Sequence, residues 1–265
     1  MKSGTIKTEE MEMRYCSFGE GERQLVILPG LDTKSVLLAA PVIENAYRCF
    51  SQDFTVTVFD RRTDMPDPYS IREMARDTAL AMQKLDIKEA NIFGASQGGM
   101  IAQYIAIDFP DLVASLILGS TICRENPMAR EVIGRWITLA EQGDRRGLSK
   151  DFTETLYSKA FQEKYGDLLL KFNDHVSDED LRRFVICAKA IEGFDTTDEL
   201  DKISCPVFVI GSLGDLVVGK DSSRELAHYL HCECYLYDEN TAHCVFDEAP
   251  DYKNRMLDFL AKIRE

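Results

Sequence analysis

The chain has 265 residues, 45% of them hydrophobic, and carries a formal net charge of −14 at pH 7. Its length suits one large α/β domain or a core domain with an insertion, and its composition is that of a soluble globular protein. The negative charge disfavours nucleic acids, anionic membrane surfaces and polyanionic substrates, so we expect a small substrate that is neutral or apolar.

No apolar run approaches the roughly 20 residues that a membrane helix needs. The first residues also lack the apolar core of a signal peptide. A cytoplasmic protein without a membrane partner is the expectation.

Strands and helices alternate along the first part of the chain. Residues 5–18 alternate loosely between apolar and polar, which predicts an antiparallel hairpin. Apolar strands are expected at residues 24–28, at 54–59, from Ala90 and at 112–118, with helices at 36–49, 70–85 and 97–109. Apolar strands separated by helices are typical of a parallel sheet that is buried on both faces.

This alternation stops between residues 121 and 203. Four helical patterns fill that stretch, at 129–142, 148–158, 161–173 and 178–191, and the last begins with the capping pair Ser177 and Asp180. Strands at 206–210 and 233–237 and helices at 222–230 and 251–263 then complete the chain. We therefore predict an α/β core from residues 1–120 and 204–265, with an all-helical cap, or lid, over residues 121–203.

The pattern Gly94-x-Ser96-x-Gly98 lies between the strand from Ala90 and the helix that follows it. This is the pattern of a nucleophile elbow, a sharp strand-to-helix turn that exposes a serine hydroxyl at the positive end of a helix. Bulky neighbours would collide in so tight a turn, and small residues surround Ser96. Ser96 is the candidate nucleophile.

Its partners are expected in loops at the carboxyl ends of the other strands, where functional groups collect in open α/β sheets. Asp215 follows the strand at 206–210, and His243 follows the strand at 233–237. His243 would accept the Ser96 proton, and Asp215 would fix the imidazole tautomer. Asp221 and Asp238 are alternatives for the acid.

On these residues the chain resembles the α/β-hydrolase superfamily, in its serine subgroup with a helical cap. The resemblance covers nearly the whole chain and includes Gly211-x-x-Gly214-Asp215-x-x-Val218 and Ala242-His243-x-x-x-x-Glu248-x-Pro250. It implies an α/β-hydrolase fold: a mostly parallel eight-stranded sheet with helices on both faces and the cap inserted after the sixth strand.

The resemblance also implies an oxyanion hole made by the backbone N–H groups of Leu31 and Gln97. The loop after the first parallel strand usually carries His-Gly in this superfamily, and here it reads Pro29-Gly30. A backbone donor needs no particular side chain, so Leu31 can still take this role.

Gly30, Asp60 and Trp136 are candidates for the substrate pocket. For Asp60 a structural role beside the turn at residues 61–63 is the favoured alternative. Trp136 belongs to a set of cap aromatics that either line an acyl pocket or, as their helical spacing favours, form the core of the cap. The others are Phe152, Phe161, Phe172 and Phe184.

The leading hypothesis is a carboxylesterase-like serine hydrolase, a monomer or homodimer, that cleaves a small ester, thioester or amide through an acyl-enzyme. Carbon–carbon bond hydrolysis and cofactor-free peroxidation on the same three residues are alternatives. A third is a relative that binds a ligand without catalysis. No cofactor is expected.

Eight scattered cysteines, without a secretory signal, predict reduced and mostly buried thiols. A zinc site could use the cluster of His228, His231, Cys232 and Cys234. Structural zinc usually takes its ligand pairs from two separated segments, so we expect no metal here.

Overall fold

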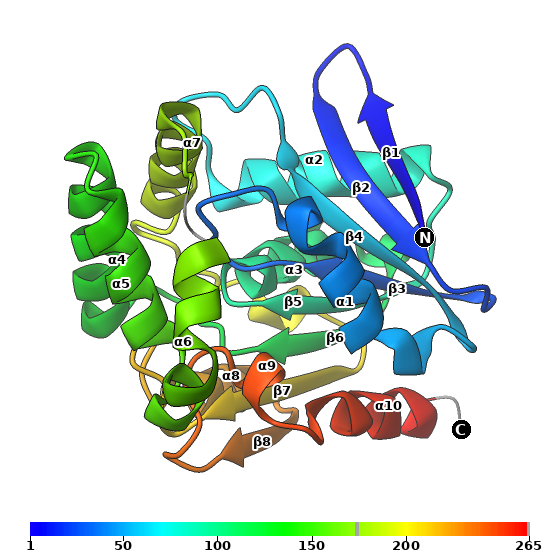
Figure 1. Cartoon of the computed structure of the whole chain (residues 1–265). Helices are drawn as coiled ribbons and strands as arrows, with labels where there is room; N and C mark the ends of the chain where they lie inside the picture. The colour runs from blue at the N-terminus through cyan, green and yellow to red at the C-terminus, as the bar shows by residue number, and fades with distance from the viewer. Residues whose placement is uncertain (173–174, 264–265) are drawn as a thin grey trace.

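The computed structural model of the chain describes residues 1–172 and 175–263, and the Phe172 side chain also lies outside the described part. Within it, eight strands form one sheet in the order β1-β2-β4-β3-β5-β6-β7-β8 (Figure 1). Only the pairs β1–β2 and β2–β4 are antiparallel. The expected eight-stranded, mostly parallel sheet is therefore confirmed.

The strands follow the expected order along the chain. Their bounds are Lys2–Lys7 (β1), Glu12–Phe18 (β2), Arg23–Leu28 (β3), Phe54–Arg62 (β4), Ala90–Ala95 (β5), Val113–Gly119 (β6), Val207–Ser212 (β7) and Glu233–Tyr237 (β8). Every residue of β5 and of β7 is buried, which explains their mostly apolar sequence.

Helices cover both faces of the sheet. One core cluster contains residues of α2 (Ile71–Lys84), α3 (Gln97–Asp108) and α8 (Ser222–Leu230), and the other contains residues of α1 (Ala40–Ala46) and α10 (Tyr252–Lys262). In Figure 1, α1 and α10 lie in front of the sheet. Each parallel strand is thus packed on two sides, as its apolar sequence requires.

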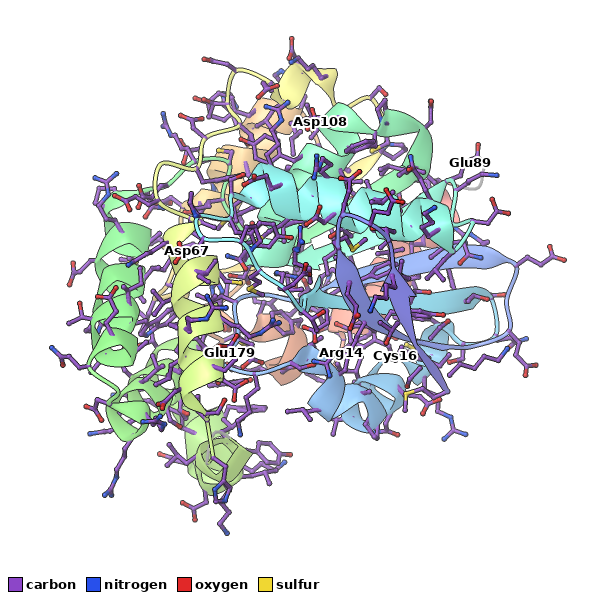
Figure 2. The ribbon with its side chains drawn as sticks, turned by 90° about the horizontal axis from the view of Figure 1, so that it is seen from above. Arg14, Cys16, Asp67, Glu89, Asp108 and Glu179 are labelled. Carbon is purple, nitrogen blue, oxygen red and sulfur yellow. The ribbon has the colours of Figure 1, made fainter. Side chains whose placement is uncertain are left out.

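Among the described residues between β6 and β7 there are four α-helices: α4 (Pro127–Glu141), α5 (Arg145–Leu156), α6 (Lys159–Phe172) and α7 (Asp178–Lys189). Ser177 and Asp180 form the expected capping box at the start of α7. Figures 1 and 2 both place these helices at one end of the sheet, toward which the parallel strands point.

Several boundaries differ from the sequence-based expectation. The helix expected at residues 36–49 is divided into a 3-10 turn (Val36–Ala39), α1 and a second 3-10 turn (Arg48–Phe50). The first division occurs at Pro41, which lacks the N–H that would continue the first turn into an α-helix. The short helix α9 (Val245–Glu248) was not expected. Asn173, the expected last residue of the third cap helix, lies outside the described residues.

In the described part of the chain, no helix combines the length and the apolar character needed to cross a membrane.

A buried ion pair fixes the carboxyl end of β4 against α2. Arg62 Nη1 lies 3.1 Å from Asp77 Oδ2, and the Asp77 side chain is 1% exposed. Tyr69 donates its hydroxyl to the same carboxylate at 2.8 Å. Because Asp60 and Arg61 immediately precede Arg62, this pair positions them too.

Replacing Asp77 by alanine removes one partner of this pair and leaves Arg62 partly unpaired. We expect Asp77→Ala to lower the free energy of unfolding by about 2–4 kcal/mol, measured by urea denaturation. The control is Glu154→Ala, which removes an exposed pair with Lys150 and should cost less than about 0.5 kcal/mol. Equal effects of the two substitutions would contradict a structural role for the buried pair.

Candidate active site

Four loops at the carboxyl ends of parallel strands bring the predicted site residues to one edge of the sheet. They follow β3, β5, β7 and β8, and they carry Leu31, Ser96, Asp215 and His243 respectively. Parallel strands present their carboxyl ends at the same edge, so residues far apart in sequence become neighbours there.

Ser96 occupies a strained turn between β5 and α3. Its backbone angles are φ 51° and ψ −120°, outside the regions that an L-residue ordinarily adopts. The surrounding hydrogen bonds hold this conformation: Ser96 N–H donates to the Gly119 carbonyl at 2.8 Å, and Thr121 Oγ1 donates to the Ser96 carbonyl at 2.7 Å. The Gly99 N–H donates to the Ser96 carbonyl at 2.9 Å, so the N–H groups of Gln97 and Gly98 come before the first intrahelical hydrogen bond of α3.

The turn depends on two glycines at points of very close approach. A Cβ on Gly98 would lie 2.0 Å from the Leu28 carbonyl oxygen, at the end of β3. A Cβ on Gly94 would lie 2.5 Å from the Gly98 carbonyl oxygen. These contacts give the physical reason for the glycines of the elbow pattern.

His243 and Asp215 form a buried pair. His243 Nδ1 lies 2.8 Å from Asp215 Oδ2, and the two residues are 2% and 4% exposed. Asp215 Oδ1 accepts the N–H groups of Val217 and Val218 at 2.8 and 2.9 Å, which fixes the carboxylate. This arrangement holds the imidazole in one orientation and leaves its Nε2 for a second partner.

The other two acid candidates lie elsewhere. Asp221 pairs with Arg224 at 3.0 Å on the surface, and the Asp238 side chain accepts the backbone N–H of Asn240. Among the three aspartates, Asp215 is the one hydrogen-bonded to His243.

The loop after β3 lies directly against Ser96. A Cβ on Gly30 would lie 3.2 Å from Ser96 Cβ and 3.8 Å from Ser96 Oγ, so this loop passes beside the hydroxyl. Asp32 Oδ1 accepts the backbone N–H of Thr33 at 2.6 Å, which shapes the loop just beyond Leu31. Leu31 follows Gly30 directly in this loop and lines the pocket described next, and its role as an oxyanion donor stays a prediction.

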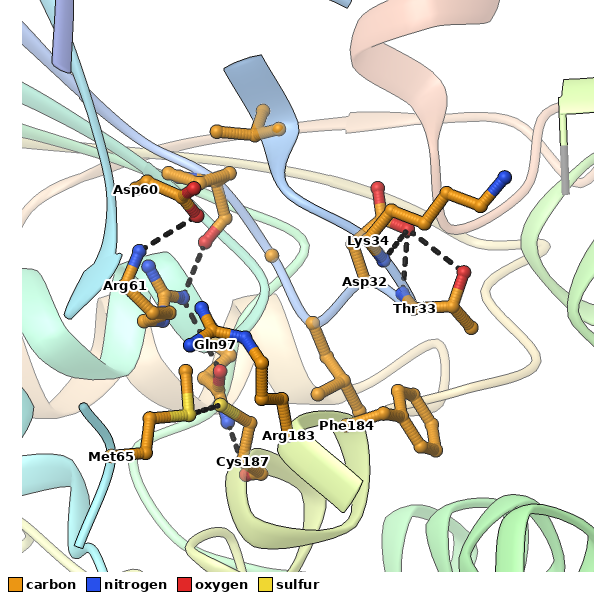
Figure 3. Close-up of a pocket in the computed structure, with 14 residues that line it drawn as sticks. Asp32, Thr33, Lys34, Asp60, Arg61, Met65, Gln97, Arg183, Phe184 and Cys187 are labelled. Carbon is orange, nitrogen blue, oxygen red and sulfur yellow. Dashed lines mark hydrogen bonds between the residues drawn. The ribbon is translucent and has the colours of Figure 1, made fainter. Parts of the chain in front are cut away.

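A small pocket of about 30 Å³ lies between this loop, the end of β4 and α7 (Figure 3). Gly30, Leu31, Asp60 and Gln97 are among the residues that line it. The 3-10 turn after the loop contributes too, because Ser35, its N-cap, donates its hydroxyl to Asp60. Asp60 thus lines the pocket and is also a structural acceptor for the Arg61 N–H at 2.8 Å.

Trp136, the third candidate for the substrate pocket, does not line this pocket. It is 2% exposed; its ring packs 4.2 Å from that of Phe152, and its Nε1 donates to Asp151 at 2.7 Å. Phe184 does line the pocket and also packs on Phe152. Trp136, Phe152 and Phe184 are therefore buried, as their helical spacing favoured, and Phe161 is half-buried.

Two cysteines lie at the site, and their surroundings keep them protonated. Burial raises the pKa of the Cys244 thiol, next to His243, well above its usual value, and the negative charge of Asp247 adds to the effect. Burial also raises the pKa of the Cys187 thiol, which lines the pocket. A protonated thiol is a poor nucleophile, so Ser96 is the stronger candidate.

The cluster of His228, His231, Cys232 and Cys234 spans the end of α8 and the start of β8. The rings of His228 and His231 lie 6.3 Å apart, centroid to centroid. No group of three or more metal-ligating side chains occurs among the described residues.

Sequence reasoning missed several residues of the site. Thr121 and Ser35 act through hydrogen bonds to Ser96 and Asp60, and Arg61 reaches from the end of β4 to the Pro29 carbonyl and to Gln97 Oε1. Thr121 and Arg61 lie at or just beyond the carboxyl ends of strands beside β5 and β3, which is the one signal that could have indicated them.

A family model described as alpha/beta hydrolase fold matches residues 25–250 of the chain. Among curated proteins, 3-oxoadipate enol-lactonase 2 of Acinetobacter baylyi is 22% identical over 231 residues, which are 85% of this chain and 84% of the relative.

Solved structures show the same fold. The α/β-hydrolase enzyme MGS-M2, from a Medee basin deep-sea metagenome library, has a TM-score of 0.86 and 20% identity, and the match covers 97% of each chain. The enol-lactonase of Burkholderia xenovorans has a TM-score of 0.83 and 21% identity over 97% of this chain and 100% of its own.

The close approach at Gly98 gives a testable expectation. Gly98→Ala should destabilise the protein by about 1–3 kcal/mol, because the new methyl group collides with backbone that cannot rotate away. The control is Gly134→Ala in α4, where a Cβ meets nothing within 4 Å. That substitution should stabilise the helix by about 0.5–1 kcal/mol. Thermal unfolding measures both, and a neutral Gly98→Ala would contradict the packing described for the turn.

Proposed function

The chain belongs to the α/β-hydrolase fold family, and on that premise we propose that it is a serine hydrolase of small esters, thioesters or amides. Ser96 is the nucleophile, His243 the general base and Asp215 the acid that orients it. Leu31 and Gln97 supply the oxyanion donors.

One observation carries this proposal: the buried hydrogen bond of 2.8 Å between His243 Nδ1 and Asp215 Oδ2. It fixes the imidazole at the sheet edge where the strained turn presents Ser96. An acid-oriented histidine at the same sheet edge as a serine elbow is the combination of groups that acyl transfer needs.

The proposed reaction has these steps. His243 Nε2 takes the Ser96 proton as Oγ attacks the substrate carbonyl, and Asp215 stabilises the imidazolium. The oxyanion accepts hydrogen bonds from the N–H groups of Leu31 and Gln97, at the positive end of α3. His243 gives its proton to the leaving group, and later activates the water that releases the acyl group.

In this proposal, residues 121–203 form a lid over the site. Gln97 Nε2 donates to the Cys187 carbonyl of α7 at 2.6 Å, so the cap rests directly on the residue after the nucleophile. Cys244 N–H donates to the Leu156 carbonyl at the end of α5 at 2.9 Å, which joins the cap to the histidine loop as well. A cap in contact with both loops excludes water and shapes the substrate pocket.

The names of similar proteins support acyl transfer as the reaction class. The Acinetobacter relative and the Burkholderia structure are both named as enol-lactonases, and a lactone is a cyclic ester. Carbon–carbon bond hydrolysis and cofactor-free peroxidation would use the same three residues, and a ligand-binding relative would use none of them.

A fluorophosphonate probe tests the nucleophile. We expect the wild-type protein to be labelled at one serine and Ser96→Ala to lose both labelling and ester hydrolysis while its unfolding temperature stays close to wild type. Ser149→Ala, in the buried part of α5, is the control that should keep both. Hydrolysis at a near-native rate by Ser96→Ala would exclude Ser96 as the nucleophile.

The acid is tested by two matched asparagine substitutions. Asp215→Asn should lower kcat by roughly 10⁴, because the amide no longer sets the correct imidazole tautomer. Asp238→Asn, in the loop nearer to His243 in sequence, should change kcat less than about threefold, since Asp238 is not bonded to the histidine. The reverse order of effects would assign the acid to Asp238.

Phe184→Leu tests the role of the cap. Phe184 lines the pocket from α7, so the smaller side chain should shift kcat/KM toward longer acyl chains in a series of p-nitrophenyl esters. Trp136→Phe, in the core of the cap, should lower stability without shifting this preference. If both variants keep the wild-type chain-length profile, the cap does not select the substrate.

A further inference from the structure

Two arginines from different parts of the chain line the pocket beside Ser96. Arg61 comes from the end of β4 and Arg183 from the cap helix α7. Figure 3 shows both guanidinium groups pointing into the same space, next to the Gln97 side chain. The pocket thus combines two guanidinium groups with the residues proposed to bind the oxyanion.

Neither arginine is neutralised by a carboxylate among the described residues. Arg61 Nη2 donates to the Pro29 carbonyl at 2.8 Å and to Gln97 Oε1 at 3.2 Å, and its buried Nε meets no acceptor in the described part of the chain. Arg183 Nη1 donates to the carbonyls of Arg62 and Thr63 at 3.1 and 2.7 Å. All of these acceptors are uncharged.

Two aspartates line the same pocket, but other donors engage them. Asp60 accepts the Ser35 hydroxyl and the Arg61 backbone N–H, and it lies 3.5 Å from the Arg14 guanidinium. Asp32 Oδ1 accepts the N–H groups of Thr33 and Lys34. The arginine side chains are therefore left with donors that face the pocket.

Cys187 lines the pocket together with Arg61 and Arg183. Burial and the negative charge of Asp60 raise the pKa of its thiol, and the positive charges of Arg61 and Arg183 lower it. Two like charges in a partly buried pocket repel each other, and an anion between them would relieve the repulsion.

We propose that this pocket binds an acidic group of the substrate, a carboxylate held by Arg61 and Arg183. The inference rests on the proposed function, because it places the carboxylate on the molecule whose carbonyl reaches Ser96. Guanidinium groups suit carboxylates through paired N–H···O bonds. The pocket volume of about 30 Å³ also suits two oxygen atoms, at roughly 10–15 Å³ for each water-sized atom.

The substrate class is then a small ester, thioester, lactone or amide with a free carboxylate. At long range, the net charge of −14 repels anions and therefore favours a neutral substrate. At contact distance the two arginines outweigh it, because charges more than about 8–10 Å apart are largely screened at physiological ionic strength.

Binding to the Ser96→Ala protein tests this without turnover. We expect calorimetric titration with monomethyl succinate, glutarate and adipate to show about 10- to 100-fold tighter binding for the best half-ester than for its dimethyl ester, from charged hydrogen bonds. Arg61→Gln and Arg183→Gln, each on this background, should lower that ratio about tenfold or more. Arg183→Lys, which keeps the charge, should retain part of it.

The matched control is Arg182→Gln, which removes the same charge from the neighbouring position of α7, where Arg182 pairs with Glu179 on the surface. It should leave the ratio unchanged. The proposal is overturned if the half-esters bind no tighter than the diesters, or if Arg182→Gln and the pocket variants behave alike. It is also overturned if acetate binds as tightly as the best half-ester, since the pocket would then hold a free anion only.

Ester hydrolysis by the wild-type protein separates the two proposals. If diesters and half-esters are hydrolysed without preference, the serine hydrolase stands and the carboxylate site fails. If the Ser96→Ala protein prefers half-esters and the wild-type protein hydrolyses none of the esters, the carboxylate site stands and the proposed reaction fails.

Discussion

The strained turn at Ser96 is the constraint on which the rest of the site depends. A residue at φ 51° and ψ −120° needs neighbours that hold it, and here they come from both adjacent strands. The end of β3 packs against Gly98, and Gly119 and Thr121, at and beyond the end of β6, bond to the backbone of Ser96. The central position of β5 in the parallel sheet supplies these contacts.

The same packing positions the groups around the hydroxyl. Because β3 is next to β5, the loop after β3 passes within van der Waals distance of Ser96 and presents Leu31 there. The loops after β7 and β8 are held together as well, since Ser212 Oγ donates to the Thr241 carbonyl at 2.7 Å. Asp215 and His243 lie just beyond these two points, so their hydrogen bond follows from the contact between the loops.

The charge of this protein has to be considered on two length scales. Its overall charge of −14 acts at long range and opposes polyanions. Within the pocket, two guanidinium groups face a volume of about 30 Å³ and have uncharged acceptors on their other sides. The amino-acid composition gives only the long-range charge, because it does not show which side chains lie together in a pocket.

The sequence by itself determined what local patterns encode. Strand and helix alternation predicted the sheet, the elbow pattern predicted the turn at Ser96, and the capping pair at Ser177 and Asp180 predicted where α7 begins. These features depend on residues that are close in the chain, so periodicity and spacing are sufficient to find them. The position of Asp215 and His243 after successive strands was also visible, because parallel strands align their carboxyl ends.

Only the tertiary structure decided the contacts between distant segments. His243 is hydrogen-bonded to Asp215 and not to Asp238, and Trp136 is buried. Arg183 of α7 and Arg61 of β4 line the same pocket. Arg61 and Arg183 are 122 positions apart, and no spacing rule connects them. Side-chain direction and the docking of the cap on the sheet set these contacts, and both emerge only when the whole core packs.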